Sequence, residues 1–283
     1  MATFFNRATL TYGTNSISSN TVSGEILQTL TATKTASNEN YALGDVITYA
    51  VALVNSGATN LTGLTLTDDL GEFAISDKLS VTPLDYVLGS LLYYVNGVLQ
   101  PTPPIITASP LSFSGISIPA GGDAVIIYNA VPNEYAPLTA GSAITNTVTV
   151  SGNSALGDIT AEETISVANA PLLSILKSLS PETVAENGTV TYTLLIENRG
   201  KAPVTSDLVV SDIFDPILEN ITVTYNGAVW SEGVNYTYDE ATGIFASLPG
   251  AITLPAATYV TDPTTGIVSV IPGSSVIRVT GTI

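Results

Sequence analysis

Three residue types in this sequence could together form a covalent bond between side chains: a lysine, an aspartate and an asparagine. Lys34, Asp68 and Asn146 each lie in a short run in which apolar residues alternate with Thr or Ser. Such alternation is typical of a strand with one buried face, and it places all three side chains on the apolar side. Something must offset their burial, because burying an isolated charge costs on the order of several kcal/mol.

The sequence leaves two interpretations of this triad open. In the first, Lys34 and Asp68 form a buried ion pair and Asn146 completes their hydrogen bonds. In the second, burial lowers the pKa of the lysine and raises the pKa of the aspartate, so that a neutral amine and a carboxylic acid become accessible. The amine is then a nucleophile, and the acid is a catalytic helper that polarises the Asn146 carbonyl. Loss of ammonia would leave a Lys–Asn isopeptide bond.

The strands that must position these residues occur twice along the chain. Segment 30–57 aligns with 173–200, and segment 64–71 aligns with 208–215. The alignment places Lys177 on Lys34 and Asp212 on Asp68, so a second reactive site is expected. The second copy ends in "PGSSVIRVTGTI", however, and has no segment that matches "ITNTVTV" of the first.

The strand that the second copy lacks resembles the beginning of the chain. "NRATLTYG" at 6–13 matches "NTVTVSG" at 146–152, so we expect a donor strand that completes the second copy and brings Asn6 to Lys177, with Asp212 as helper. The donor could fold back within one chain or enter the next molecule. The second route is donor-strand complementation, and a head-to-tail contact of this kind gives a filament. It is favoured because fold-back requires a short linker to span the first copy. The residues expected to face the groove are Phe4, Asn6, Ala8, Leu10 and Tyr12.

The repeats predict an all-β chain with two tandem immunoglobulin-like β-sandwich domains and an N-terminal donor strand. Thr, Val, Ser and Asn suit pleated, half-buried strands, and 23 Gly and 16 Pro mark the turns between them. The expected segments are a donor strand at 1–13, a linker and strand at 14–27, domain 1 at 28–152, a linker at 153–170, and domain 2 without its last strand at 171–283.

Composition argues against several classes of function. The net charge is −17, with 7 Lys and Arg against 24 Asp and Glu, so nucleic acid is not an expected partner. The chain has 0 Cys and 0 His, which removes disulfides, thiolate chemistry and the commonest general base and metal ligand. We expect no cofactor, no metal and no enzymatic activity beyond autocatalytic isopeptide formation.

The numbered sequence contains no apolar run long enough for a signal peptide or a transmembrane span. We therefore expect no membrane insertion. For an extracellular place on a cell or spore surface, we expect either that a leader is removed before this numbering begins, or that the protein reaches the surface without one, for example by lysis of the producing cell.

The quoted motifs, together with the "GD-x-[IV]-TY" pattern, resemble the bacterial surface conserved-repeat-domain family (domain of unknown function, family eleven). The resemblance covers 28–152, 171–283 and the N-terminal strand. It implies immunoglobulin-like sandwiches similar to collagen adhesins and Gram-positive pilins, which carry Lys–Asn isopeptides with an acidic helper. It assigns those roles to Lys34, Asp68 and Asn146, and it matches Lys177 and Asp212 without an asparagine of their own. The beginning of the chain is also similar to appendage subunits of clostridial endospores.

The leading functional expectation is a structural subunit of an extracellular filament. Its partner is a second copy of itself, with isopeptides within and between subunits, and its attachment partner is unknown. The alternative is a surface adhesin or carbohydrate-binding module. Spontaneous fibres would support the first, and a monomer with a saturable glycan ligand would support the second.

Overall fold

The computed structural model describes residues 2–26, 29–103, 105–152 and 157–283. All regular secondary structure in these ranges is β-strand, and the chain divides into two compact units. Unit 1 comprises Met1–Pro137 and Ala143–Ser166, and unit 2 comprises Leu138–Ser142 and Val167–Ile283. The prediction of an all-β chain with two tandem sandwich domains is confirmed.

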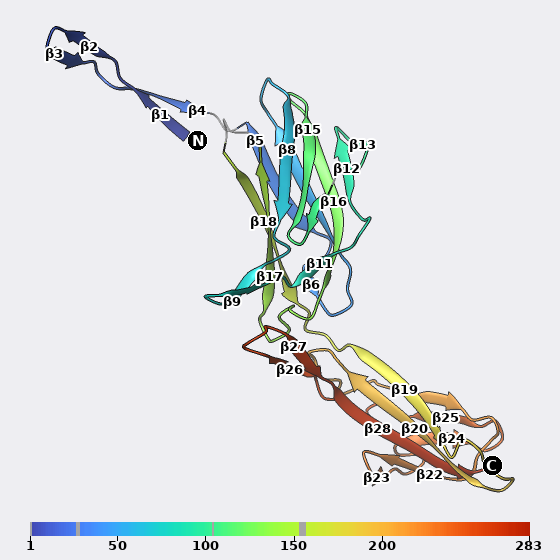
Figure 1. The fold of residues 1–283 in the computed structure, drawn as a ribbon. Coiled ribbons are helices and arrows are strands. Elements are labelled where there is room, and N and C mark those ends of the chain that lie inside the picture. Colours follow the sequence, from blue (N-terminus) through green and yellow to red (C-terminus); the bar gives the residue numbers. More distant parts are fainter. Residues whose placement is uncertain (1, 27–28, 104, 153–156) are drawn as a thin grey trace. The chain divides into compact units, whose positions relative to one another are not determined.

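Unit 1 is a sandwich of two six-stranded antiparallel sheets (Figure 1). The inward-facing positions of both sheets alternate with exposed ones, which is why the Thr-rich sequence forms strands rather than helices. The first sheet runs β13 (Val98–Gln100), β12 (Leu92–Val95), β16 (Asp123–Pro132), β7 (Ile47–Asn55), β5 (Leu30–Ala36), with β11 (Leu84–Tyr86) also paired to β16. The second runs β14 (Ile105–Ala108), β15 (Leu111–Ile118), β8 (Leu61–Asp68), β17 (Ala143–Ser151), β18 (Ile159–Val167), β6 (Asn40–Tyr41). A separate hairpin joins β9 (Phe73–Ser76) and β10 (Leu79–Val81).

Unit 2 repeats the first sheet but has a shorter second one. The five-stranded sheet runs β19 (Leu173–Ser180), β20 (Thr189–Asn198), β28 (Gly273–Thr282), β22 (Glu219–Tyr225), β23 (Ala228–Val229). The three-stranded sheet runs β21 (Ser211–Ile213), β25 (Ile244–Ser247), β24 (Tyr236–Asp239), and a hairpin joins β26 (Thr258–Thr261) to β27 (Val268–Ile271). The described part of unit 2 therefore holds no counterpart of β17 and β18, and β21 is an edge strand where its counterpart β8 is central.

A buried asparagine closes the same corner in both units. Asn55 ends β7, and its side chain donates to the carbonyls of Thr59, Ile118 and Pro119. Its counterpart Asn198 ends β20 and makes the equivalent set of bonds to backbone groups. Both amides satisfy backbone groups that have left their strand ladders, so the aligned "N-x-G" positions mark a structural corner.

Residues 2–26 form a hairpin of their own. In it, β1 (Ala2–Asn6) pairs with β4 (Val22–Ile26), and β2 (Thr9–Tyr12) pairs with β3 (Asn15–Ser18). The structure thus pairs the predicted donor strand with residues 15–26, and not with a strand of unit 2. Residues 15–26, within the segment expected at 14–27 as linker and strand, are the second arm of this hairpin, and each arm satisfies the backbone groups of the other.

The predicted linker at 153–170 also differs from the structure, since β18 lies within it and pairs with β17 along its whole length. This strand has only one buried side, where Ile159, Ile165 and Val167 alternate with exposed polar residues. Because its other face is polar, the sequence of this segment predicts a linker and not a strand. Residues 1, 27–28, 104 and 153–156, which fall in the segments predicted at 1–13, 14–27, 28–152 and 153–170, lie outside the described residues.

Replacing either corner asparagine by alanine should destabilise the protein. In Asn55→Ala and Asn198→Ala, several buried backbone groups lose their partner, so we expect a loss of about 2 kcal/mol or more in the free energy of unfolding. Urea unfolding measures this loss. Asn38→Ala, at an exposed position of unit 1, is the control and should change stability by less than about 0.5 kcal/mol. Equal effects of all three substitutions would contradict the role of the corner.

Candidate cross-linking site

Unit 1 holds the predicted lysine and aspartate as a fully buried ion pair. Lys34 lies on β5 opposite Val51 of β7, and Asp68 is the last residue of β8. The Lys34 Nζ atom is 2.6 Å from Asp68 Oδ2, and both side chains are 0% exposed. Asp68 Oδ1 accepts a second hydrogen bond from the backbone N–H of Leu70. The alternation in the two strands therefore brings these two residues together in the core, as the sequence predicts.

Burial changes the acid–base chemistry of both groups. Desolvation is the largest influence on Lys34 and lowers its pKa, although the attraction of Asp68 opposes this shift. Desolvation likewise raises the pKa of Asp68 against the opposing effect of Lys34. Both directions favour transfer of a proton from the ammonium to the carboxylate, because the neutral forms tolerate a dry site better than the ions. The site can thus present a neutral amine beside a carboxylic acid.

Asn146 reaches this pair through a tyrosine. It lies on β17 and is fully buried, and its Nδ2 donates to the hydroxyl of Tyr128 at 3.3 Å. The Tyr128 hydroxyl in turn donates to Asp68 Oδ2. The Oδ1 atom of Asn146 accepts no hydrogen bond from the described residues. Asn146 therefore joins the cluster with its carbonyl oxygen unpaired, and it does not complete the hydrogen bonds of the ion pair directly.

Sequence reasoning missed two tyrosines of this cluster. Tyr128 and Tyr49 are stacked, with ring centroids 5.6 Å apart, and Lys34 Nζ lies 5.0 Å from the centroid of the Tyr49 ring. The signal was present in the alternation of β16, which places Tyr128 on the same inner face as Ile126 and Ala130. A buried tyrosine hydroxyl needs a polar partner, and the predicted aspartate was the nearest candidate on that face.

Unit 2 contains the same ion pair in an open setting. Lys177 Nζ lies 2.5 Å from Asp212 Oδ2, but the two side chains are 41% and 17% exposed. The lysine also lies over two aromatic rings, 4.6 Å from the centroid of Tyr192 and 5.3 Å from that of Phe214. Val279 pairs with Tyr192 where Tyr128 pairs with Tyr49, so this site lacks the bridging hydroxyl.

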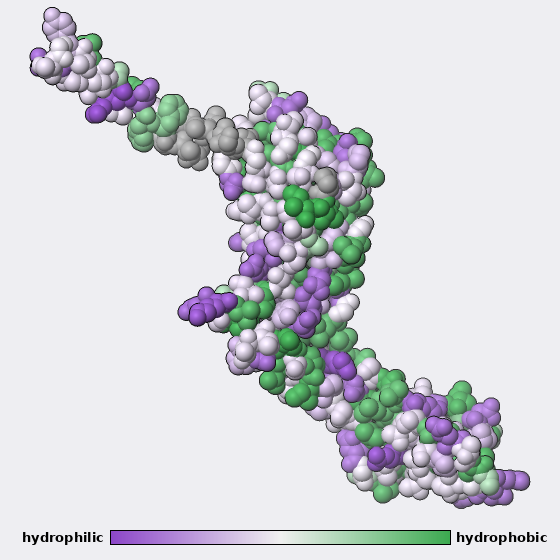
Figure 2. Space-filling view, in the orientation of Figure 1, coloured by the Kyte–Doolittle hydropathy of each residue, from purple (hydrophilic) through white to green (hydrophobic). Residues whose placement is uncertain are grey.

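An apolar groove runs beside the open pair. It has a volume of about 340 Å³ and lies between β19 of one sheet and the β21 edge of the other. Leu173 at its rim is 42% exposed, whereas the aligned Leu30 of unit 1 is 2% exposed. Figure 2 shows hydrophobic atoms on the surface over β19. The groove is lined by Leu173, Ser174, Ile175, Ile196, Leu208, Val209, Val210 and Ser211.

The expected donor residues lie in the N-terminal hairpin with their side chains in solvent. Phe4, Leu10 and Tyr12 are 53%, 70% and 86% exposed. Asn6 is exposed at the end of β1, and the exposed Ala8 lies between β1 and β2. The hairpin thus offers a row of apolar side chains to water, which is unfavourable unless a partner covers them.

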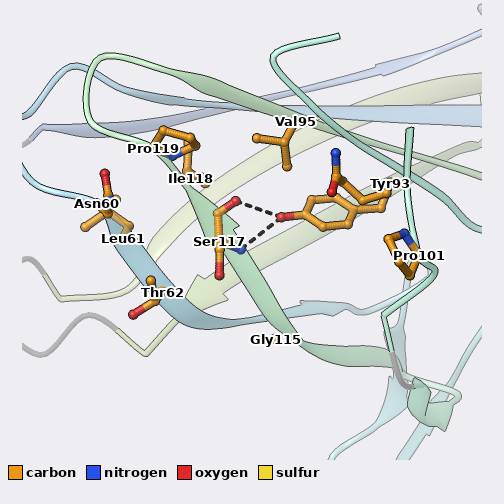
Figure 3. Close-up of a pocket in the computed structure, with 11 residues that line it drawn as sticks. Asn60, Leu61, Thr62, Tyr93, Val95, Pro101, Gly115, Ser117, Ile118 and Pro119 are labelled. Atoms are coloured by element: carbon orange, nitrogen blue, oxygen red, sulfur yellow. Dashed lines mark hydrogen bonds between the residues drawn. The ribbon is translucent and has the colours of Figure 1, made fainter. Parts of the chain in front are cut away.

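A second hollow lies on unit 1, with a volume of about 420 Å³. Tyr93, Val95 and Pro101 line one side and Asn60, Thr62 and Ser117 the other (Figure 3). The Tyr93 hydroxyl donates to the carbonyl of Ser117 and accepts from its N–H, so this polar group is already used within the protein.

The described residues contain no group of three or more acidic side chains arranged to hold a metal ion. They also form no helix with the length and apolar character needed to cross a membrane.

Comparison with solved structures finds surface proteins of Gram-positive bacteria at low similarity. The pilus backbone protein of Streptococcus pneumoniae matches at 15% identity and a TM-score of 0.35, over 86% of this chain and 55% of its own. The major pilin subunit of Bacillus cereus matches at 11% identity and a TM-score of 0.37, over 98% of this chain and 74% of its own. The collagen-binding domain of a Staphylococcus aureus adhesin matches at 12% identity and a TM-score of 0.30, over 50% of this chain and 99% of its own.

This chain therefore spans about half the length of the pneumococcal protein. No protein-family model matches the chain, so membership of the conserved-repeat family remains a prediction. A search of curated proteins finds no match either.

The two ion pairs should respond differently to loss of their lysine. Lys34→Met leaves a buried carboxylate without its cation and should lower the free energy of unfolding by about 3–5 kcal/mol. Lys177→Met removes a partly exposed partner and should cost less than about 1 kcal/mol. Urea unfolding of both variants measures the difference.

The double variant Lys34→Met with Asp68→Leu serves as the control. It removes both buried charges, so part of the lost stability should return. Equal losses in the two single variants would contradict the difference in burial between the sites.

Proposed function

We propose that this chain is the structural subunit of an extracellular filament, in which the N-terminal residues of one molecule complete unit 2 of the next by donor-strand complementation. One observation carries the proposal. The same Lys–Asp pair is sealed by β17 in unit 1 and lies open beside a groove in unit 2. A segment with the residue pattern of β17 occurs at 6–13, and its apolar side chains are exposed.

The edge of β21 supports this docking. An edge strand presents unpaired N–H and C=O groups that can pair with a strand from another chain. Groove residues such as Leu173 and Ile175 would cover the exposed side chains of Phe4 and Leu10. Asn6 would then occupy, in the Lys177–Asp212 cluster, the place that Asn146 occupies in the Lys34–Asp68 cluster.

We further propose that each completed site forms a Lys–Asn isopeptide bond. In unit 1 the proton of the Lys34 ammonium passes to Asp68, and the free amine attacks Cγ of Asn146. The protonated Asp68 donates to the carbonyl oxygen as negative charge develops there. A proton then moves from the attacking nitrogen to the departing amide nitrogen, and ammonia leaves. The products are one secondary amide and one ammonia, so no oxidant or other reagent is needed.

The Oδ1 of Asn146 is unpaired and so is available to a protonated Asp68, in a cluster where the hydroxyl of Tyr49 is unpaired as well. A buried carbonyl oxygen without a donor is unfavourable by about 1–3 kcal/mol, and it needs an explanation. The protonated Asp68 would supply the missing donor. The same reaction between Lys177 and Asn6 of another molecule, with Asp212 as helper, would make the filament covalently continuous.

The same proposal places the filament on a cell or spore surface. It also relates the chain to the family-eleven repeats and to clostridial endospore appendages. A filament without Cys gains cross-links that no reductant breaks. The proposal includes no catalytic activity on other molecules. The adhesin alternative requires a ligand site, and the hydroxyl of Tyr93 in the hollow on unit 1 is already bonded to Ser117. We therefore prefer the filament.

The internal bond predicts a change in mass. The intact chain should be lighter than its sequence mass by one ammonia, and Asn146→Ala should remove this deficit. Mass spectrometry of the denatured monomer measures it directly. Asn129→Ala, on β16 of the other sheet, is the control and should keep the deficit. A monomer with the full sequence mass would contradict the proposed bond between Lys34 and Asn146.

Assembly provides the test of docking and of the bond between subunits. The chain should form fibres visible by negative-stain microscopy, and deletion of residues 2–12 should abolish them. Asn6→Ala should leave fibres that fall apart in hot detergent, whereas fibres of Asn20→Ala should give ladders on a denaturing gel. Normal fibres from the deletion variant would overturn the docking proposal. Ladders from Asn6→Ala would overturn the Lys177–Asn6 bond alone.

A further inference from the structure

We infer that the segment donated to unit 2 is the whole hairpin of residues 2–26, which enters as two paired strands. This inference rests on the proposed function, but its donor is a two-stranded hairpin and not a single strand. In unit 1, β8 is followed across the sheet by β17 and then by β18. In unit 2, the counterpart β21 has neither neighbour among the described residues. Two strand positions beyond the β21 edge are therefore unfilled among the described residues, and a single donor strand would leave a new open edge.

The hairpin repeats the cross-strand pairs of β17 and β18. Residues directly opposite each other in an antiparallel pair lie on the same face. On the inner face of unit 1, Ile144 pairs with Ile165, Asn146 with Glu163, and Val150 with Ile159. At the matching positions of the hairpin, Phe4 pairs with Gly24, Asn6 with Val22, and Leu10 with Ile17, with one extra residue on the second arm between the last two pairs. Both hairpins thus have an asparagine on the first arm between two apolar pairs.

The pair Phe4–Gly24, at the end of the hairpin away from its turn, differs from the matching Ile144–Ile165 pair of unit 1. A Cβ on Gly24 would lie 2.4 Å from the Phe4 ring, so the ring covers this glycine. One large and one absent side chain therefore replace the two isoleucines of unit 1. The glycine of the second arm thus makes room for the phenylalanine of the first arm. This fit indicates that the two arms stay paired.

Exposure separates the two hairpins. Ile144, Val150, Ile159 and Ile165 are buried in unit 1, whereas Phe4, Leu10, Ile17 and Val22 are exposed. Ile17 and Val22 belong to the second arm, so a single-strand donor would leave them in water. Docking of the whole hairpin removes apolar side chains of both arms from solvent.

The order of elements along the chain is also the same. The β17–β18 hairpin precedes β19, the first strand of unit 2, just as the N-terminal hairpin precedes β5, the first long strand of unit 1. In the first case the hairpin completes the sandwich that comes before it. An intact hairpin also keeps its own backbone hydrogen bonds during docking, whereas a single-strand donor would first have to break them.

A disulfide across the hairpin tests this inference, because the chain has 0 Cys of its own. Thr9 and Ser18 are opposite each other on the face away from Leu10 and Ile17. Opposite residues in antiparallel strands have Cα atoms about 4.5–5.5 Å apart, which suits a disulfide. The variant Thr9→Cys with Ser18→Cys should form fibres equally well in its oxidised and reduced forms.

Fibres from the reduced form alone would overturn the hairpin donor and support a single strand that must leave its partner. If the parent chain itself forms no fibres, the proposed function fails. Failure of the proposed function is thus distinguished from failure of the hairpin inference.

A second pair of variants provides an independent measurement. Ile17→Asp places a charge on the groove-facing side of the second arm and should reduce fibre yield at least tenfold. Ser18→Asp places the same charge on the opposite face and should assemble like the parent chain. Equal yields from the two variants would overturn the inference, because a single-strand donor does not use the second arm.

Discussion

The structure depends on one electrostatic constraint, the burial of a lysine and an aspartate inside a sandwich whose core is aliphatic and aromatic. In unit 1 both side chains are removed from water, and β17 with Asn146 seals them. Burial of a charge pair is costly unless its geometry and hydrogen bonds are good, and here it shifts both pKa values toward the neutral forms. The same constraint in unit 2 is met only in part, because no described strand covers Lys177 and Asp212.

Two unfavourable surfaces follow from this difference. Unit 2 has an apolar groove and an open strand edge at β21, and the N-terminal hairpin has apolar residues exposed along one face. Each surface by itself is an aggregation liability. Unit 2 and the N-terminal hairpin together supply the strands that make up the complete sandwich of unit 1. Assembly between copies accounts for both with the interactions that already stabilise unit 1.

Part of this could be predicted from the sequence. Strict alternation around Lys34 and Asp68 determined their faces, and the repeat placed Lys177 and Asp212 correctly opposite each other. The role of Tyr128 was not predicted, because a tyrosine in an alternating strand has the pattern of any core residue. β18 was missed, and the second arm of the hairpin was predicted only as a linker and strand at 14–27, because a strand with one polar face has too few apolar residues to stand out from a linker. The exposure of Lys177 depends on a neighbouring strand, which local sequence does not encode.

The most direct test of the account is an electron cryomicroscopy structure of the assembled fibre. The account predicts that residues 2–26 of one molecule lie beside β21 in unit 2 of the next, with Asn6 against Lys177. A fibre in which the β21 edge is open, or is covered by residues of the same molecule, would contradict it.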